Sequence, residues 1–132
     1  MSQAAQDAPS PQRPEDGPSG CTAARLFHVL WENLADVLGA AATAALVRRS
    51  AKRLASRVPG RESVAVAREG FTYRYTLPAR WNEEDRETLV ALRDLVKELL
   101  PILAELTGPV VVRRIEALAE FRRCGVLLSE VE

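Results

Sequence analysis

The sequence is poor in the residues that build catalytic and metal centres. It has one histidine, two cysteines and few aromatic side chains, which make up 5% of the chain. It contains no C-x-x-C pair, no phosphate-binding glycine loop, no nucleophile elbow and no pair of carboxylates in a recognisable frame. The sequence therefore gives no support for enzyme activity. We expect no catalytic residue, no metal and no cofactor.

Long apolar runs and a charge of one sign are also missing. The richest apolar stretch, residues 99–106, is interrupted by Pro101 and Glu105, and it is far shorter than the roughly 20 residues that cross a membrane. The 18 basic and 18 acidic residues cancel, which argues against a nucleic-acid binder. There is no apolar signal segment, and two cysteines are too few for a disulfide framework. The expected location is the cytoplasm, without membrane contact.

The first twenty residues differ in composition from the rest. They contain four prolines and no large apolar residue after Met1. Such a segment cannot bury enough apolar surface to offset the entropy lost on ordering it. We expect residues 1–20 to form a disordered, proline-rich leader and residues 21–132 to form a single compact domain.

The clearest structural pattern lies in residues 82–107. Apolar residues recur there at alternating steps of three and four, which is typical of one face of an α-helix. Asn82 is the expected N-cap and Gly108 is the expected C-cap. Pro101 is expected to kink the helix; the alternative is two helices that meet at Leu100 and Pro101. We expect the apolar stripe to be buried within the chain; the alternative is a dimer seam between two chains. The stripe consists of Leu89, Leu92, Val96, Leu99, Leu103 and Leu106.

Two helices are expected before this stretch and one after it. The first, residues 22–38, is separated by Gly39 from the second, residues 40–58. A single long helix through Gly39 is the alternative, at a cost of about 1 kcal/mol for the glycine. The last helix is expected to run from Pro109 to Arg123.

Residues 63–77 show the period-two alternation of a β-hairpin with its turn at 68–70. A lone hairpin is marginally stable in water, so its apolar face must pack on the helices or on another strand. The elements together predict a helix-dominated α+β fold in the order helix, helix, β-hairpin, helix, helix. The second strand is expected to place Phe71, Tyr73, Tyr75 and Leu77 on the apolar face.

A basic cluster ends the second helix. Its residues stand about one turn apart, and no acidic residue lies among them. We predict that this face binds an acidic protein partner, and nucleic-acid binding is a weaker alternative. The alternative without binding is a solvated helix end that matches the helix dipole. The cluster consists of Arg48, Arg49, Lys52, Arg53 and Arg57.

Charge also divides the chain into two parts. Residues 22–58 carry six basic and two acidic residues, a net +4, whereas residues 82–132 carry seven basic and eleven acidic residues, a net −4. Opposite charges favour attraction between these parts, within one fold or across a homodimer. The sequence therefore predicts a small regulatory module that binds other proteins, self-associates and offers its basic helix face to an acidic partner.

A small-molecule sensor is the alternative function. Its pocket would lie between the aromatic face of the hairpin and the helices. His28, the obvious candidate, stands one turn from Glu32, which favours a solvated surface histidine over a ligand or base. The candidate ligand contacts are His28, Tyr73, Tyr75 and Cys124.

Overall fold

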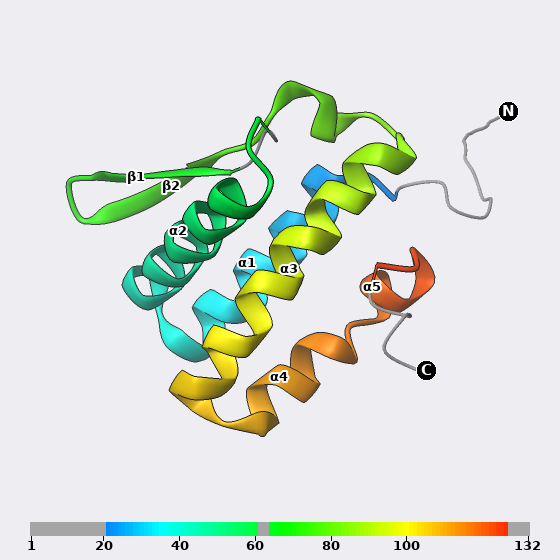
Figure 1. The fold of residues 1–132 in the computed structure, drawn as a ribbon. Helices are drawn as coiled ribbons and strands as arrows, with labels where there is room; N and C mark the ends of the chain where they lie inside the picture. Colours follow the sequence, from blue (N-terminus) through cyan, green and yellow to red (C-terminus); the bar gives the residue numbers. More distant parts are fainter. Residues whose placement is uncertain (1–20, 61–63, 127–132) are drawn as a thin grey trace, which may run out of the picture.

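The computed structural model describes residues 21–60 and 64–126, so the leader expected at 1–20 lies outside the described residues. Helices dominate the fold and one antiparallel hairpin interrupts them, which confirms the predicted α+β class and the order of its elements (Figure 1). The elements are α1 (Ala23–Leu38), α2 (Ala40–Arg57), β1 (Ala65–Glu69), β2 (Thr72–Thr76), the 3-10 helix η1 (Ala79–Asn82), α3 (Arg86–Thr107), α4 (Pro109–Glu116) and α5 (Ala119–Arg123).

Two separate helices, α1 and α2, precede the hairpin, as the glycine between them predicts. The Thr22 hydroxyl caps α1 by accepting a hydrogen bond from the Arg25 backbone N–H at 3.2 Å. Gly39 has a φ of 87°, a backbone conformation that residues with a Cβ rarely adopt. The chain therefore turns between the helices, and the alternative of one long helix is wrong.

The helix α3 runs through the middle of the molecule, with α2 and the hairpin on one side of it and α4 and α5 on the other (Figure 1). It begins three residues later than predicted, because Asn82 belongs to η1. Asp85 is the N-cap instead, and its carboxylate accepts a hydrogen bond from the Glu87 backbone N–H at 2.9 Å. The helix continues through Pro101 to Thr107, so the chain does not form two helices at the proline.

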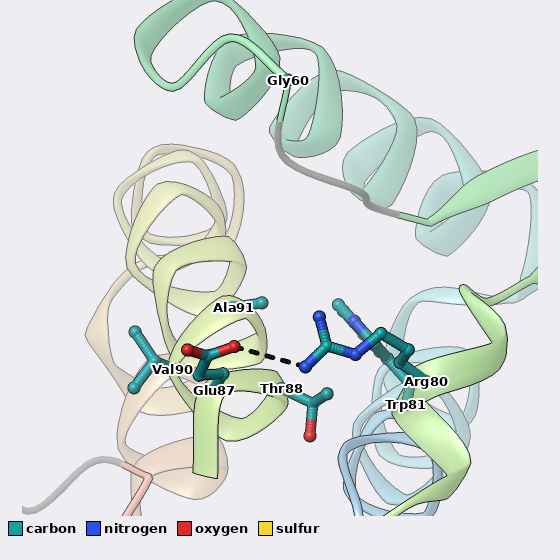
Figure 2. Close-up of a pocket in the computed structure, with 7 residues that line it drawn as sticks. All are labelled: Gly60, Arg80, Trp81, Glu87, Thr88, Val90 and Ala91. Carbon is teal, nitrogen blue, oxygen red and sulfur yellow. Dashed lines mark hydrogen bonds and ion pairs between the residues drawn. The ribbon is translucent and has the colours of Figure 1, made fainter. Parts of the chain in front are cut away.

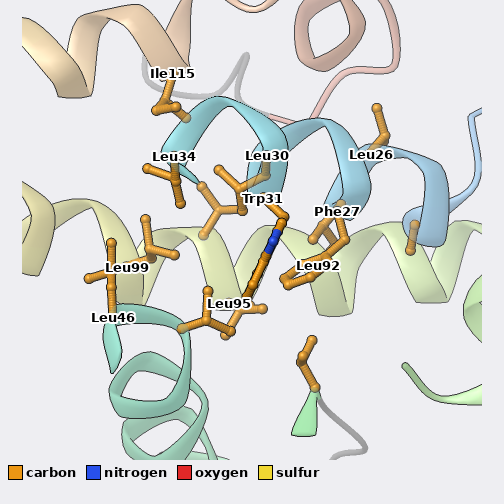
Figure 3. Close-up of a cluster of buried hydrophobic side chains, with 14 of the residues drawn as sticks. Leu26, Phe27, Leu30, Trp31, Leu34, Leu46, Leu92, Leu95, Leu99 and Ile115 are labelled. Atoms are coloured by element: carbon orange, nitrogen blue, oxygen red, sulfur yellow. The ribbon is translucent and has the colours of Figure 1, made fainter. Parts of the chain in front are cut away.

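The apolar stripe of α3 forms the centre of the hydrophobic core. Four of its six residues are fully buried within the single chain: Leu92, Val96, Leu99 and Leu103. In Figure 3, Leu92, Leu95 and Leu99 of α3 lie among side chains of α1 and Leu46 of α2, and Ile115 of α4 lies beside Leu34 of α1. The interpretation of the stripe as an intramolecular core is therefore confirmed for these four residues. Leu89 is half-buried, and Leu106 is 63% exposed.

The hairpin covers one flank of this core. Val66 pairs with Tyr75 and Arg68 pairs with Tyr73 in the antiparallel register. Val66, Tyr73 and Tyr75 are partly buried against the core, as the alternation predicts. Phe71 departs from the prediction, because it lies in the turn rather than in β2 and is 96% exposed.

The C-terminal part is not the continuous helix predicted from Pro109 to Arg123. α4 ends at Glu116, and α5 begins only after Leu118, whose φ of −59° and ψ of 127° are not helical. Ile115 and Phe121 are both buried in the core. In one continuous helix, two side chains six positions apart would point about 120° away from each other around the axis. The break allows both side chains to face the core.

The two cysteines form a disulfide, which the small number of cysteines and the expected cytoplasmic location did not predict. Cys21 directly precedes Thr22, the N-cap of α1, and Cys124 directly follows α5; 103 positions separate the two cysteines in the sequence. Their number alone excludes a framework of several bridges, but it does not show whether the fold brings the pair together. The bond ties the end of α5 to the start of α1, and Cys124 therefore has no free thiol for a ligand.

Candidate anion-binding cleft

The basic cluster at the end of α2 has structural duties within the chain. Arg48 donates a hydrogen bond from Nη2 to the Val66 carbonyl oxygen at 3.1 Å, which joins α2 to β1. Arg57 forms an ion pair with Glu98 of α3, and Arg53 Nε lies 4.0 Å from Glu98 Oε1. Three of the five predicted partner-binding residues therefore already have acceptors in the fold.

Glu98 explains why arginines gather there. Its side chain is only 7% exposed, although most of the residues that α3 buries are apolar. A buried carboxylate is costly unless it is paired and hydrogen-bonded. Arg53 and Arg57 supply that pairing from the exposed surface of α2. Arg49 and Lys52 are exposed, and they form no ion pair within the described part of the chain.

The contact between the hairpin and the helices is filled by aromatic rings. The Tyr75 ring centre lies 4.8 Å from that of Phe27 and 5.0 Å from that of Trp31. A hydrogen bond of 2.8 Å joins the Tyr75 hydroxyl to His28 Nδ1, and His28 Nε2 lies 3.9 Å from the Glu32 carboxylate. Burial first, and then the Glu32 charge, raise the pKa of Tyr75. The fold thus brings His28 and Tyr75 together. Aromatic rings fill the space between the hairpin and the helices, where the ligand pocket was predicted.

Tyr73 and Cys124, the other two candidate ligand contacts, do not join this pair. Tyr73 is half-buried on β2, where it pairs with Arg68 across the hairpin. Cys124 lies beyond α5 in the disulfide. The sequence-predicted ligand site is therefore not assembled as one site.

A cavity of about 620 Å³ lies between η1, the first turns of α3 and the end of α2 (Figure 2). Arg80 crosses it and pairs with Asp85 at 2.7 Å and with Glu87 at 3.2 Å. The Glu87 backbone N–H and then the Arg80 guanidinium hold the pKa of Asp85 below its ordinary value. The same two carboxylates raise the pKa of Arg80. Among the described residues, the single positive charge of Arg80 is paired with two carboxylates, so this cavity has no unpaired positive charge to offer an anion.

A second cavity, of about 340 Å³, has a different character. It lies between the first two turns of α3 and the segment that ends α5. Four arginines line it, and no acidic side chain is among its lining residues in the described chain. We call this feature the arginine cleft. Its lining residues are Arg86, Leu89, Val90, Arg93, Arg122, Arg123, Cys124, Gly125 and Val126.

The arginine cleft combines positive charge with an apolar surface. Arg86, Arg93 and Arg122 form no ion pair with any other described residue. Arg123 points its Nη1 at Cys21 Sγ, 3.8 Å away. Val126 is buried, Leu89 is half-buried, and Val90 is 44% exposed. An acidic ligand with apolar side chains would match both properties.

The two walls of the cleft come from distant parts of the sequence. Arg86 and Arg93 stand seven residues apart on α3, so they lie on one face with Leu89 and Val90 between them. Arg122 belongs to α5, and only the fold brings it opposite α3. In the sequence Arg122 and Arg123 stand next to Cys124, and no local pattern connects them with the α3 wall opposite.

Comparisons with known protein families, with curated proteins and with solved structures give no match to this chain. Within residues 21–60 and 64–126, no three side chains of histidine, cysteine, aspartate or glutamate are grouped so that they could hold a metal ion. Over the same residues, no helix has the length and apolar character needed to cross a bilayer. The geometry of the arginine cleft is therefore the basis for a functional proposal.

Proposed function

We propose that this protein is a small interaction module that binds an acidic segment of a partner protein in the arginine cleft. The observation that carries the proposal is the gathering of Arg86, Arg93 and Arg122, each without an ion pair among the described residues, around one cavity. Guanidinium groups bind carboxylates through two parallel hydrogen bonds, and like charges held together without partners repel one another. A bound acidic segment would relieve that repulsion.

An acidic protein segment fits the cleft better than nucleic acid does. The apolar surface of Leu89, Val90 and Val126 has no counterpart in a phosphate backbone, whereas an acidic peptide can place apolar side chains there. The net charge of the whole chain is zero, so long-range attraction of nucleic acid is weak. The prediction of an acidic partner is thus retained, and its expected site moves from α2 to the arginine cleft.

The structure affects three other expectations from the sequence in different ways. The small-molecule alternative has lost the pocket on which it depended, because aromatic rings fill the space between the hairpin and the helices. Self-association remains a prediction, but the buried residues of the α3 stripe are not available as its seam. Cytoplasmic location also remains a prediction, and the disulfide is unusual for that compartment.

Fluorescence anisotropy tests the proposed site with a defined probe, a fluorescein-labelled peptide of alternating glutamate and leucine. The test variant is Arg86→Glu with Arg93→Glu. The matched control is Arg49→Glu with Lys52→Glu, which reverses two exposed charges on α2 that also have no ion pair with a described residue. We expect the cleft variant to bind at least about tenfold more weakly, a loss of about 1.4 kcal/mol, and the control to stay within about twofold of the unaltered protein.

The same measurement separates the competing sites. Binding that is lost only in the α2 control would place the site on the α2 basic face and overturn the proposal. Equal losses in both variants would show nonspecific charge attraction and would also overturn it. Displacement of the peptide by inorganic phosphate at equal charge concentration would point to a phosphate ligand instead. Circular dichroism of each variant confirms that the fold is intact.

A further inference from the structure

The wall of the arginine cleft that carries Arg122 and Arg123 belongs to α5, the shortest α-helix of the described chain. α5 has five residues, and an isolated helix of that length does not persist in water. Its position depends on tertiary anchors. One anchor is apolar and consists of Phe121 and Val126, which are buried in the core. The other anchor is the Cys21–Cys124 disulfide.

The disulfide lies at a position that a reductant in solution can reach. Cys21 is buried, with 3% of its surface exposed, whereas Cys124 is half-buried and lines the arginine cleft. A reductant that enters the cleft therefore reaches the Cys124 sulfur first. Arg123 Nη1 lies 3.8 Å from the Cys21 sulfur, so a positive charge stands beside the sulfur that would leave as a thiolate.

We infer that the Cys21–Cys124 disulfide is a redox gate that assembles the arginine cleft when oxidised and disassembles it when reduced. This inference rests on the proposed function for its biological meaning, because the gated site is the proposed peptide site. In the oxidised protein the bond holds α5 against the start of α1, so that Arg122 and Arg123 face Arg86 and Arg93. In the reduced protein α5 keeps only its apolar anchor and opens more often.

The gating reaction is a thiol–disulfide exchange with a dithiol such as dithiothreitol. A thiolate of the dithiol attacks the Cys124 sulfur, the bond between the cysteine sulfurs breaks, and its electron pair leaves on Cys21 beside Arg123. The second thiol of the reagent, as a thiolate, then attacks the mixed disulfide, which closes the oxidised ring and releases Cys124. Two electrons and two protons pass in total from the dithiol to the two cysteines. Oxidation of the protein reverses the exchange.

Binding and reduction must be coupled if the gate exists. An acidic peptide that binds only the assembled cleft stabilises the oxidised arrangement, and by thermodynamic linkage the disulfide strengthens peptide binding by the same factor. The peptide also covers Cys124 and blocks the approach of the reductant. The module would bind its partner under oxidising conditions and release it when thiols reduce the disulfide.

The test compares oxidised and dithiothreitol-reduced full-length protein, with the peptide of alternating glutamate and leucine as the probe. We expect reduction to weaken peptide binding at least about tenfold. We expect the variant Cys21→Ser with Cys124→Ser to bind as weakly as the reduced protein, with no response to dithiothreitol. Equal affinity of the oxidised and reduced forms would overturn the gate.

Hydrogen exchange followed by mass spectrometry tests the gate without a ligand. On reduction, amide exchange should increase in residues 118–126 and remain unchanged in α2 and the centre of α3. Unchanged exchange in 118–126 would overturn the gate, even if the double serine variant failed to fold. If exchange increases there but the oxidised protein does not bind the peptide, the gate stands and the proposed function fails. If the peptide binds both forms equally, the proposed function stands and the gate fails.

Discussion

Two groups of arginines in this protein have the same chemistry and opposite surroundings. At the end of α2, Arg53 and Arg57 pair with the buried carboxylate of Glu98. In the arginine cleft, Arg86 and Arg93 face a cavity whose lining residues in the described chain include no acid. The first group stabilises the fold, because a buried charge needs partners. The second group has no acidic partner among the described residues, and that difference is the reason why we propose it as a binding surface.

The comparison shows why density of charge in the sequence is a poor guide to a binding site. The α2 cluster is dense in the sequence, but two of its five residues neutralise one buried carboxylate of α3 and a third binds the hairpin backbone. The cleft arginines are dispersed over two helices that the fold brings together. Charged side chains that have no oppositely charged partner within the fold are a better guide to a surface that can bind another protein.

The largest expected effect concerns the α5 wall of the cleft. Phe121→Ala removes a fully buried ring from the core and should lower the free energy of unfolding by about 3–5 kcal/mol. The matched control is Phe71→Ala, which removes the same ring from a turn where it is 96% exposed, and its change should stay within about 0.5 kcal/mol. Urea denaturation followed by circular dichroism measures both. Similar losses in the two variants would contradict the assigned anchoring of α5.

The next effect tests the structural duty of the α2 arginines. Arg53→Ala combined with Arg57→Ala leaves the Glu98 carboxylate buried without its two partners, and should lower the free energy of unfolding by about 1–3 kcal/mol. Adding Glu98→Leu removes the unpaired charge and should restore much of that loss. Denaturant midpoints of the double and triple variants measure the difference. A triple variant less stable than the double variant would contradict this account of the cluster.

A smaller effect concerns the first turn of α3, where Arg86 stands. The pKa of Asp85 is lowered by the Glu87 backbone N–H and by Arg80, so the folded protein favours the ionised N-cap. Because the pKa of Asp85 is lower in the folded protein than in the unfolded chain, its ionisation stabilises the fold at pH values above the ordinary pKa of 3.8. This stabilisation is lost as the pH falls through the pKa of the folded protein. Asp85→Asn keeps a capping oxygen but does not titrate. Its thermal midpoint should therefore fall less than that of the unaltered protein between about pH 5 and pH 2. Parallel acid profiles would show that Asp85 does not act in this way.

Sequence periodicity predicted the elements that depend on local patterns. The glycine at position 39 separated α1 from α2, and the three-four spacing of α3 identified the core residues Leu92 and Leu99. Errors arose where two local signals compete or where packing decides. Asn82 and Asp85 are both good caps, and the chain uses the later one. The last predicted helix breaks because its two large residues must face the same core.

The candidate site could not be predicted in the same way. Arg86 and Arg122 are 36 positions apart, and Cys21 and Cys124 are 103 apart. No local propensity reports such proximity, because it depends on how α3, α5 and the start of α1 pack together. His28 stands out in the sequence as the single histidine, whereas nothing local distinguishes these four residues. In the structure its imidazole bonds to Tyr75 on the surface.

The smallest expected effect is also the sharpest test of the comparison. Arg86→Ala, Arg93→Ala and Arg122→Ala each remove a charge that has no ion pair among the described residues, so each should change the free energy of unfolding by no more than about 0.5 kcal/mol. Combining the three should not destabilise the protein further, because it removes repulsion within the cleft. Thermal and urea denaturation measure the series beside the Arg53 and Arg57 variants. A loss comparable to that of the α2 pair would mean that the cleft arginines also hold the fold together, and the distinction between the two groups would disappear.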